Sequence, residues 1–450
     1  MSNKNKMNNE KYWVYDDYFI FKPEFDEPIE KYVGIISDYS KLIFSDYNDC
    51  EITIKIINNP IFRFNYSNNI SRSKFNKQMP NQFEQSNKLI KLEKITFGYS
   101  FNQPLKNTLF QLSNLTQIYL GYTFNKPLGN SLSQSLNLKE LIFGDYFNKP
   151  LANSLNNLCR LEILTLGHHF NFSLDKSLNN LFSLEKLTLG FEFNRHLGNS
   201  LNKLTSLKEL FFNVKFNQPL DNSFDFLVSL EKLTFGDYFN QPLANSLDKL
   251  INLSQLFFGG CFNQPLTYSL DKLINLNKLS FGNTFNKPLA NSLDKLINLS
   301  QLSFGYEFNA QLANSFDKLI NLTFITFGRD FNQPINNIIY HLTKLEHLGL
   351  GREFNQELLL PPNIKILTLD CNNQHLIDLL PNSIEQLNLN SNFDLPLDNL
   401  PNSIKKISFD KESDYNKSLN NLPKSLEQLE LPFEYNLKIE NIPTNCKIIQ

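Results

Sequence analysis

Cysteine, glycine and excess charge of either sign are all scarce in this chain of 450 residues. Basic and acidic residues number 43 and 45, so no strongly basic surface favours sequence-independent binding to nucleic acid. No apolar run approaches the roughly 18 residues of a membrane span, and the N-terminus lacks the apolar core of a secretory signal. The five cysteines are Cys50, Cys159, Cys261, Cys371 and Cys446, too far apart to indicate a disulfide framework or a thiolate metal site. We therefore expect a cytoplasmic protein without a cofactor.

The most regular feature of the chain is a Phe-Asn pair that returns every 23 residues. Residues 239–253 read FNQPLANSLDKLINL, and the phrase begins again at Phe262 and Phe285. The spacing holds without insertion for Phe101, Phe124, Phe147, Phe170, Phe193, Phe216, Phe239, Phe262, Phe285, Phe308, Phe331 and Phe354. A period of about 20 to 29 residues with L-x-x-L-x-L is typical of leucine-rich-repeat solenoids, in which coils bury their apolar faces against one another.

The fold that we predict is an α/β-type repeat solenoid, a leucine-rich-repeat-like superhelix. Its parallel β-sheet would lie on the concave face, with short 3₁₀-helical, helical or extended segments on the convex side. Leu256 and Phe258 are two apart, as in a strand with both side chains in the core. The NSLxxL that begins at Asn245 predicts a capped single turn of helix or 3₁₀-helix on the outer side.

Three further positions of the coil have a predicted role. Glycine follows the strand in eleven coils and Asn213 takes its place in the twelfth, which predicts a left-handed turn. The twelve phenylalanines are expected to stack as an internal column. The asparagines next to them either form an amide ladder between coils or occupy exposed turns.

The phrase FNxPL…NSLxxLxxLxxLxFG, over residues 92–360, resembles the FNIP repeat. That repeat is a member of the leucine-rich-repeat superfamily, abundant in social amoebae and in giant viruses of amoebae. The resemblance implies a surface that binds other proteins, in the host cytoplasm if the chain is viral. Some members of the family carry an N-terminal F-box that connects them to ubiquitin ligases.

Four segments are expected along the chain. They are an N-terminal cap (1–35), degenerate coils (36–91), regular coils (92–360) and shorter coils that begin with Leu-Pro (361–450). One degenerate coil is placed around Phe75. The segment EPIEKYVGIISDY, residues 27–39, loosely resembles the first helix of an F-box. The alternative is a capping helix with Ile29, Tyr32, Val33 and Ile36 on one face.

Outward-pointing strand residues, and the residues just after the glycines, form the predicted binding surface on the concave face. Exposed aromatics beside alternating charges are typical of protein-binding surfaces. The candidate partner-binding residues are Tyr99, Tyr119, Tyr122, Tyr146, His169, Phe191, Phe211, Tyr238, Phe257 and Tyr306. Alternatively, these tyrosines only pack against one another as a ladder.

Residues suited to catalysis or metal binding do not gather in any recognisable motif. His168, His169 and His347 have no repeated Cys, Asp or Glu nearby, which favours surface positions over metal ligands. Asp330 and Glu353 lie one coil apart beside Arg329 and Arg352, and the four predict ion pairs between coils.

These observations predict a non-enzymatic scaffold or adaptor that binds another protein through its concave face, with no nucleic-acid or membrane partner. One alternative is a substrate receptor that binds the linker protein of a ubiquitin ligase through an F-box. The other is a glycan or peptide binder, with its site near Tyr122, Tyr146 and His169.

Overall fold

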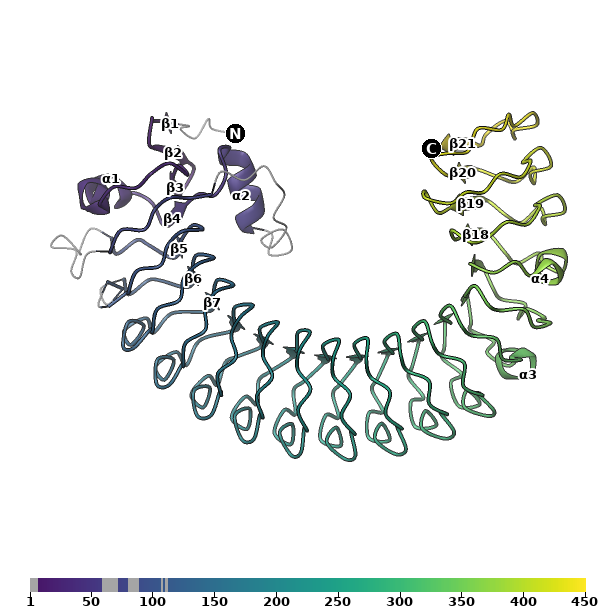
Figure 1. Ribbon diagram of the computed structural model, residues 1–450, viewed down its shortest axis with the longest axis horizontal. Helices are drawn as coiled ribbons and strands as arrows, with labels where there is room; N and C mark the ends of the chain where they lie inside the picture. Colours follow the sequence, from purple (N-terminus) through teal and green to yellow (C-terminus); the bar gives the residue numbers. More distant parts are fainter. Residues whose placement is uncertain (1–6, 59–71, 80–88, 107, 110–111) are drawn as a thin grey trace. The chain divides into compact units, whose positions relative to one another are not determined.

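Two compact units make up the chain, residues 1–230 and residues 231–450. The computed structural model describes residues 7–58, 72–79, 89–106, 108–109 and 112–450. Each unit is a solenoid in which one short strand of every coil joins a parallel sheet (Figure 1). The predicted repeat solenoid of leucine-rich-repeat type is therefore confirmed.

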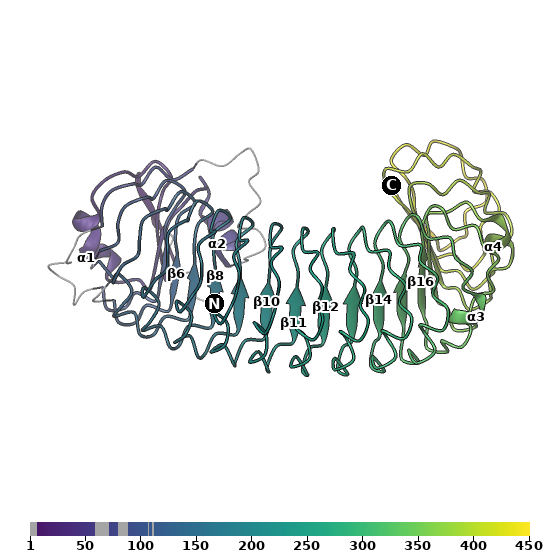
Figure 2. The same cartoon turned by 60° about the horizontal axis from the view of Figure 1, so that its bottom comes forward.

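The N-terminal unit contains β1 (Met7–Asn8), β2 (Tyr12–Tyr15), β3 (Tyr18–Phe21), η1 (Ile29–Tyr32), α1 (Val33–Ile36), β4 (Lys41–Phe44), α2 (Cys50–Asn58), β5 (Lys94–Thr96), β6 (Gln117–Tyr119), β7 (Glu140–Ile142), β8 (Ile163–Thr165), β9 (Lys186–Thr188) and β10 (Glu209–Phe211). The C-terminal unit contains β11 (Lys232–Thr234), β12 (Gln255–Phe257), β13 (Lys278–Ser280), β14 (Gln301–Ser303), β15 (Phe324–Thr326), α3 (Asn336–Ile339), β16 (His347–Leu350), β17 (Ile366–Leu369), α4 (Gln374–Asp378), β18 (Gln386–Leu389), β19 (Lys406–Phe409), β20 (Gln428–Glu430) and β21 (Lys447–Ile449). From β3 to β10, and again from β11 to β21, consecutive strands pair in parallel (Figure 2).

The regular strands have one buried residue between two that point outward. In β12, Leu256 is fully buried, whereas Gln255 and Phe257 are partly exposed. Leu256 pairs with Leu279 of β13, which stands 23 residues further along the chain. The sequence period is therefore the distance between stacked positions, because one coil adds one strand to the sheet.

The repeated phenylalanines form an internal column in each unit, as predicted. Six rings from Phe101 to Phe216 and six from Phe239 to Phe354 stack with 5.9–6.2 Å between neighbouring ring centroids. All twelve are at most 1% exposed. A second column in the C-terminal unit, with 5.5–5.6 Å between centroids, is formed by Phe235, Phe258, Phe281, Phe304 and Phe327.

The asparagines beside the first column form an amide ladder. The backbone N–H of Asn125 donates to Oδ1 of Asn102 at 2.9 Å, and that of Asn263 donates to Oδ1 of Asn240 at 2.9 Å. The same bond, 2.9–3.1 Å long, joins the neighbouring regular coils within each unit. Each side chain thus satisfies a backbone donor of the next coil. Of the two alternatives that the sequence leaves open, the ladder is confirmed.

The left-handed turn predicted at the strand ends is wrong. Among the described residues, the only glycines with positive φ are Gly129 and Gly198, which lie in the outer turns. A strand-end glycine is required instead because the preceding coil is so close: a Cβ built on Gly282 would lie 1.8 Å from the carbonyl oxygen of Gly259. At the exception, Asn213, the side chain is exposed and donates to the carbonyl of Leu189 at 2.6 Å.

The outer turns are runs of 3₁₀-type turns, as predicted. The N–H of Ser246 donates to the carbonyl of Leu243 at 2.9 Å, and that of Asp248 donates to the carbonyl of Asn245 at 3.1 Å. The left-handed backbone occurs here, with φ of 38–53° at Lys106, Gly129, Ala152, Asp175, Gly198, Asp221, Ala244, Thr267, Ala290 and Ala313. Eight of these ten residues carry a side chain, which costs roughly 1–2 kcal/mol at each position.

Glycine is therefore expected to stabilise the protein where it replaces alanine in these turns. Ala244→Gly and Ala290→Gly should each raise the free energy of unfolding by about 1 kcal/mol, because the clash of Cβ with the backbone is removed. Ala310, whose φ is not positive, provides the control. There the same substitution should lower that free energy by roughly 0.5–1 kcal/mol, since it only adds flexibility. Urea unfolding of the three variants measures the difference. A loss of stability in all three would contradict this assignment of strain.

The N-terminal cap is a β-hairpin that continues the sheet. Strands β2 and β3 pair antiparallel, and β3 pairs in parallel with β4. Strand β4 in turn pairs directly with β5, with Lys41 beside Lys94. Of the segment between these two strands, residues 59–71 and 80–88 lie outside the described residues, so the expectation of degenerate coils in 36–91 stays a prediction.

Phe75 and Asn76, which lie between β4 and β5 in the sequence, occupy the same two stacked positions as the regular Phe-Asn pairs. The ring of Phe75 lies 6.0 Å from that of Phe101. Oδ1 of Asn76 accepts the backbone N–H of Asn102 at 2.9 Å. The column and the ladder therefore begin before the regular coils.

Helix α2 packs on the outward side of the first strands. Tyr18, Ile20 and Ile43, at outward strand positions, form a cluster with Trp13 and with Cys50 and Ile54 of α2. Ile29, Val33 and Ile36 of η1 and α1 are buried at the other side, as an amphipathic cap requires. Residues 7–58 thus hold a hairpin and three short helices that complete the solenoid, and no separate three-helix module lies within this stretch.

The Leu-Pro coils also join the sheet, as predicted. The carbonyls of their prolines accept backbone N–H groups at 2.9–3.2 Å in bonds that turn the chain, for example from Ile384 to Pro381 at 3.2 Å. Strands β17 to β19 of these coils are four residues long, like β16 at the end of the regular coils, whereas β20 and β21 have three residues, like β5 to β15. Helix α4 replaces the expected extended segment in one of these coils.

Candidate functional site

The first and third residues of the strands form an exposed surface in each unit, called here the strand face. Lys186 of β9 is paired with Glu209 of β10 at 2.9 Å, and its ammonium lies 5.0 Å from the ring centroid of Phe211. In the C-terminal unit, the ammonium of Lys232 lies 5.6 Å from the ring centroid of Phe257. The two predicted phenylalanines of the strand face are only partly exposed, and a lysine ammonium lies over each ring.

Tyr119 also occupies the strand face but is only 6% exposed. The ammonium of Lys94 lies 4.8 Å from its ring centroid, and its hydroxyl donates to the carboxylate of Glu140 at 2.5 Å. These contacts hold the side chain within the N-terminal unit, so its ring offers little area to a partner.

A row of rings follows the strand ends of the N-terminal unit. We call it the edge strip; it consists of Tyr99, Tyr122, Tyr146, His168, His169 and Phe191. Tyr99 stacks on Tyr122 with 4.6 Å between centroids, and Tyr146 meets Tyr122 edge-on at 5.2 Å. The rings of Tyr146 and His169 are 5.0 Å apart. Five of the predicted residues are therefore brought together in one continuous row.

The remaining member of the edge strip, His168, was not among the predicted binding residues. Its ring stacks on Phe191 with 4.3 Å between centroids and lies 5.0 Å from that of His169. The sequence contained the signal, because His168 has the same place after the glycine as Tyr99 and Tyr122 in other coils.

The edge strip combines stacking with exposure. Tyr146 is 48% exposed and His169 is exposed, whereas Tyr99 and Tyr122 are half-buried. Burial raises the pKa of the Tyr122 phenol, and the negative charge of Asp145 adds to the shift. Tyr122 therefore remains a neutral hydroxyl at physiological pH. The rings stack on one another, as the ladder interpretation predicts, and they also present surface, while their binding to a partner stays a prediction.

In the C-terminal unit, Tyr238 and Tyr306 are 53% and 58% exposed. They stand three coils apart in sequence, and among the described residues neither stacks on another ring. The structure does not assemble them, or Phe257, into a row like the edge strip.

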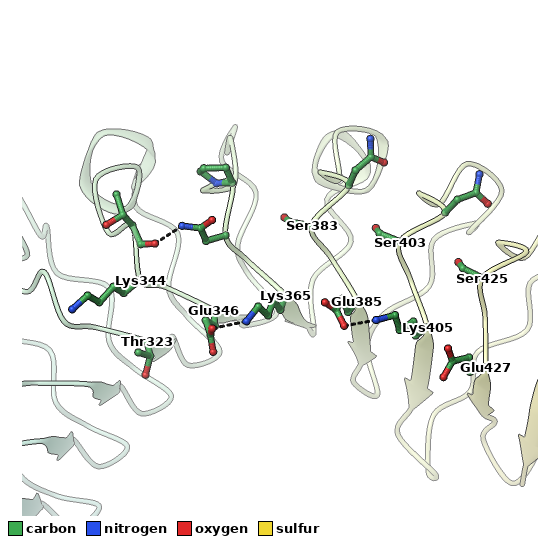
Figure 3. Close-up of a pocket in the computed structure, with 15 residues that line it drawn as sticks. Thr323, Lys344, Glu346, Lys365, Ser383, Glu385, Ser403, Lys405, Ser425 and Glu427 are labelled. Atoms are coloured by element: carbon green, nitrogen blue, oxygen red, sulfur yellow. Dashed lines mark hydrogen bonds and ion pairs between the residues drawn. The ribbon is translucent and has the colours of Figure 1, made fainter.

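A polar groove of about 890 Å³ crosses the shorter coils of the C-terminal unit (Figure 3). Along one side, Lys365 pairs with Glu346 at 2.6 Å and Lys405 pairs with Glu385 at 2.9 Å. Ser383 is one of the serines between this row and the outer turns, and its hydroxyl has no hydrogen-bond partner in the described structure. Two of the three lysines that line the groove already meet carboxylates, and the third, Lys344, donates to Oδ1 of Asn321 at 2.6 Å, so the groove presents little positive charge without a partner.

An exposed isoleucine stripe on the outer turns was missed by the sequence analysis. Ile251, Ile274, Ile297 and Ile320 repeat every 23 residues in the C-terminal unit and are 52–60% exposed. The side-chain amide of Asn275 donates to the carbonyl of Ile251 at 2.8 Å, and the bond repeats in the next two coils. The repeated LINL contained the signal, because only its two leucines are needed for the core.

Side chains that could bind a metal or act in catalysis do not cluster in the part of the chain that the structure describes. Within the described ranges, no three His, Cys, Asp or Glu side chains are close enough together to hold a metal ion. The ion pair of Arg329 is with Asp330 in the same coil, at 2.7 Å, so the predicted pairing between coils is wrong there.

Burial lowers the pKa of His347, whose Nε2 lies 2.9 Å from Oγ1 of Thr368. His347 is thus a neutral member of a hydrogen-bonded strand face.

Comparison with known proteins agrees with this architecture. The family model described as FNIP Repeat matches residues 354–392 and 372–412, mainly in the shorter coils and C-terminal to most of the segment that carried the resemblance. A search of the curated proteins found no match. In the part of the chain that is described, no helix is long and apolar enough to cross a membrane.

Several solved structures share the fold. CroV588, a circular leucine-rich-repeat protein, is 27% identical with a TM-score of 0.64. The alignment covers 98% of this chain, which spans 60% of the length of CroV588. The TLR13–ssRNA13 complex is 18% identical over 79% of this chain and 60% of that one, with a TM-score of 0.58.

The Drosophila Toll–Spatzle complex is 13% identical over 89% of this chain and 51% of that one, with a TM-score of 0.57. At such identities the likeness concerns the fold alone. Together with the parallel sheet, these comparisons show FNIP repeats within residues 354–412 of a solenoid of the leucine-rich-repeat type.

Proposed function

We propose that this chain is a non-enzymatic scaffold that binds another protein through the edge strip and the strand face of its N-terminal unit. The observation that carries the proposal is the edge strip itself. Its rings are held in contact with one another by the regular spacing of the coils, so they lose little conformational entropy when a partner covers them. Tyr146 and His169 provide exposed aromatic surface, and charged strand residues such as Lys186 lie in the same unit.

The proposed role is consistent with the way a repeat separates buried positions from exposed ones. A solenoid gives each coil the same buried residues and leaves the outward positions free to vary. In the N-terminal unit those positions carry rings, which are typical of the centre of a protein interface, and charges, which are typical of its rim. A ubiquitin-ligase receptor is not favoured, since residues 7–58 form part of the solenoid instead of a separate helical module.

Capture of partners by the full-length protein tests this function. Because FNIP repeats are abundant in amoebae, the bait is immobilised and exposed to an amoebal cell extract. The test variant combines Tyr146→Ser with His169→Ser, which removes exposed rings and leaves the buried columns intact. The control is Tyr268→Ser, which removes a ring that is 76% exposed on the outer turns.

Proteins that bind the unsubstituted chain and the Tyr268→Ser control, but not the double variant, are the expected result. Retention of the same proteins by all three baits would refute binding through the edge strip. Deleting residues 1–60 would be a poorer test, because it removes strands β2 to β4 and exposes the edge of β5.

A further inference from the structure

Asp145 occupies the centre of the edge strip. It has the place after the strand-end glycine that Tyr122 has one coil earlier and His168 one coil later. Its carboxylate is half-buried, and the structure gives it no ion-pair or hydrogen-bond partner among the described residues. Burial raises the pKa of this carboxyl, while His168 and His169 shift it the opposite way. A carboxylate removed from water in this manner gains stability if a cation meets it.

The same strip already holds one cation of its own chain. The guanidinium carbon of Arg72 lies 4.3 Å from the ring centroid of Tyr99, on a ring that also stacks on Tyr122. Close by, the half-buried carboxylate of Asp46 accepts the backbone N–H groups of Ser73 and Tyr99, both at 2.8 Å. Burial raises the pKa of Asp46, while these two N–H groups and the positive charge of Arg72 shift it the opposite way. Arginine, aromatic ring and half-buried aspartate thus form one arrangement at the start of the strip.

At Asp145 the rings and the carboxylate recur without the cation. We propose that Asp145, with the rings of Tyr122, Tyr146 and His169, receives an arginine side chain of the partner protein. A guanidinium suits this place better than an ammonium, because its planar face stacks on aromatic rings while its edge donates to a carboxylate. The inference rests on the proposed scaffold function, for which it names the chemistry of the partner: a segment with an exposed arginine.

The C-terminal unit provides a natural comparison. Its coil at Gly236 repeats the pentapeptide GDYFN that surrounds Asp145, with Asp237 and Tyr238 at the equivalent positions. There, Gly260 and Cys261 stand where His168 and His169 follow Asp145 in the next coil. Asp237 is exposed, and its Oδ1 accepts the N–H of Gly260 at 3.5 Å. Asp237 therefore has the same sequence context without the same rings or burial, and it is expected to bind arginine weakly.

Binding of two labelled peptides to the full chain tests the inference. One is fluorescein-Gly-Arg-Ser-Arg-Gly-amide, and the other has citrulline in place of both arginines, which keeps the shape and removes the charge. Fluorescence anisotropy measures their affinities for the unsubstituted protein, for Asp145→Asn and for Asp237→Asn. We expect the arginine peptide to bind the unsubstituted protein at least about tenfold more tightly than the citrulline peptide. Asp145→Asn should abolish that preference, and Asp237→Asn should leave it unchanged.

The inference is overturned if the unsubstituted protein does not distinguish the two peptides, if Asp145→Asn keeps the preference, or if Asp237→Asn loses it equally. Thermal melting of both variants shows whether the coils remain folded. Asp145→Asn is expected to be no less stable than the unsubstituted protein, because it removes a half-buried charge that has no ion-pair partner among the described residues. Scaffold function is judged separately, by capture of cellular partners. Should Asp145→Asn retain partners that the Tyr146→Ser and His169→Ser variant loses, the arginine site fails while the scaffold function stands.

Discussion

Replacing Gly282 with alanine is expected to lower the free energy of unfolding by about 3–5 kcal/mol, the largest effect that we predict for a single methyl group. The new Cβ would lie 1.8 Å from the carbonyl oxygen of Gly259 and 2.3 Å from its carbonyl carbon. Both atoms belong to the backbone, so no side chain can rotate away. Relief requires that the coil of Gly282 separate from the preceding coil, which weakens the column and the ladder between them.

Gly129 is the matched control because a different structural reason favours glycine at that position. It has a φ of 53° in an outer turn, and a Cβ there would have nothing within 4 Å. Gly129→Ala should therefore cost only about 1–2 kcal/mol, the strain of a left-handed alanine. Urea unfolding and hydrogen exchange of the amides in β12 to β14 measure the two effects. If both substitutions cost the same, close approach is not the reason for the strand-end glycines.

A second substitution separates the two explanations of Gly282 more sharply. A left-handed turn would tolerate asparagine better than alanine, since asparagine adopts positive φ most readily after glycine. Close approach makes asparagine at least as harmful, because it adds the same Cβ and further atoms. Gly282→Asn is thus expected to be no more stable than Gly282→Ala. A clear recovery of stability with asparagine would restore the left-handed turn.

The internal positions were predictable because the period in sequence is also the distance between stacked coils. Residues that recur every 23 positions contact the equivalent residues of the neighbouring coils. The period alone therefore predicts that Phe262 belongs to a column and that Asn263 can belong to a ladder. The sequence predicts that the strand-end positions require glycine, but it does not give the reason. A residue without a side chain is the same signal for positive φ and for a close approach of two backbones. Positive φ at Ala244 had no signal, because alanine does not favour that conformation.

The surface was less predictable than the interior. Tyr119 and Tyr146 look alike in sequence, yet Tyr119 is 6% exposed and Tyr146 is 48% exposed. The difference arises from neighbours in other coils: Lys94 and Glu140 enclose Tyr119. The direct pairing of β4 with β5 had no signal in the sequence for a related reason. An insertion breaks the period, and pairing across it depends on strand contacts that a single sequence does not reveal.

Phe285→Ala is expected to lower the free energy of unfolding by about 3–5 kcal/mol, through lost burial and the cavity that remains. Phe285 contacts Phe262 and Phe308 along its column at 6.0 Å and Phe281 of the second column at 4.1 Å, so its removal interrupts both directions of packing. Phe281→Leu is the control. Leucine already fills that place at Leu120, Leu166, Leu189 and Leu350, and the change should cost only about 1 kcal/mol.

The location of the damage is as informative as its size. Each coil of a solenoid contacts only its neighbours, so a break in the column at Phe285 should act locally. Hydrogen exchange should accelerate in β12, β13 and β14 and remain slow in β18 and β19, four or more coils away. Uniform acceleration throughout the C-terminal unit would mean that the unit unfolds as one cooperative block. In that case the stacked phenylalanines would support the whole unit, and not only the coils that they join.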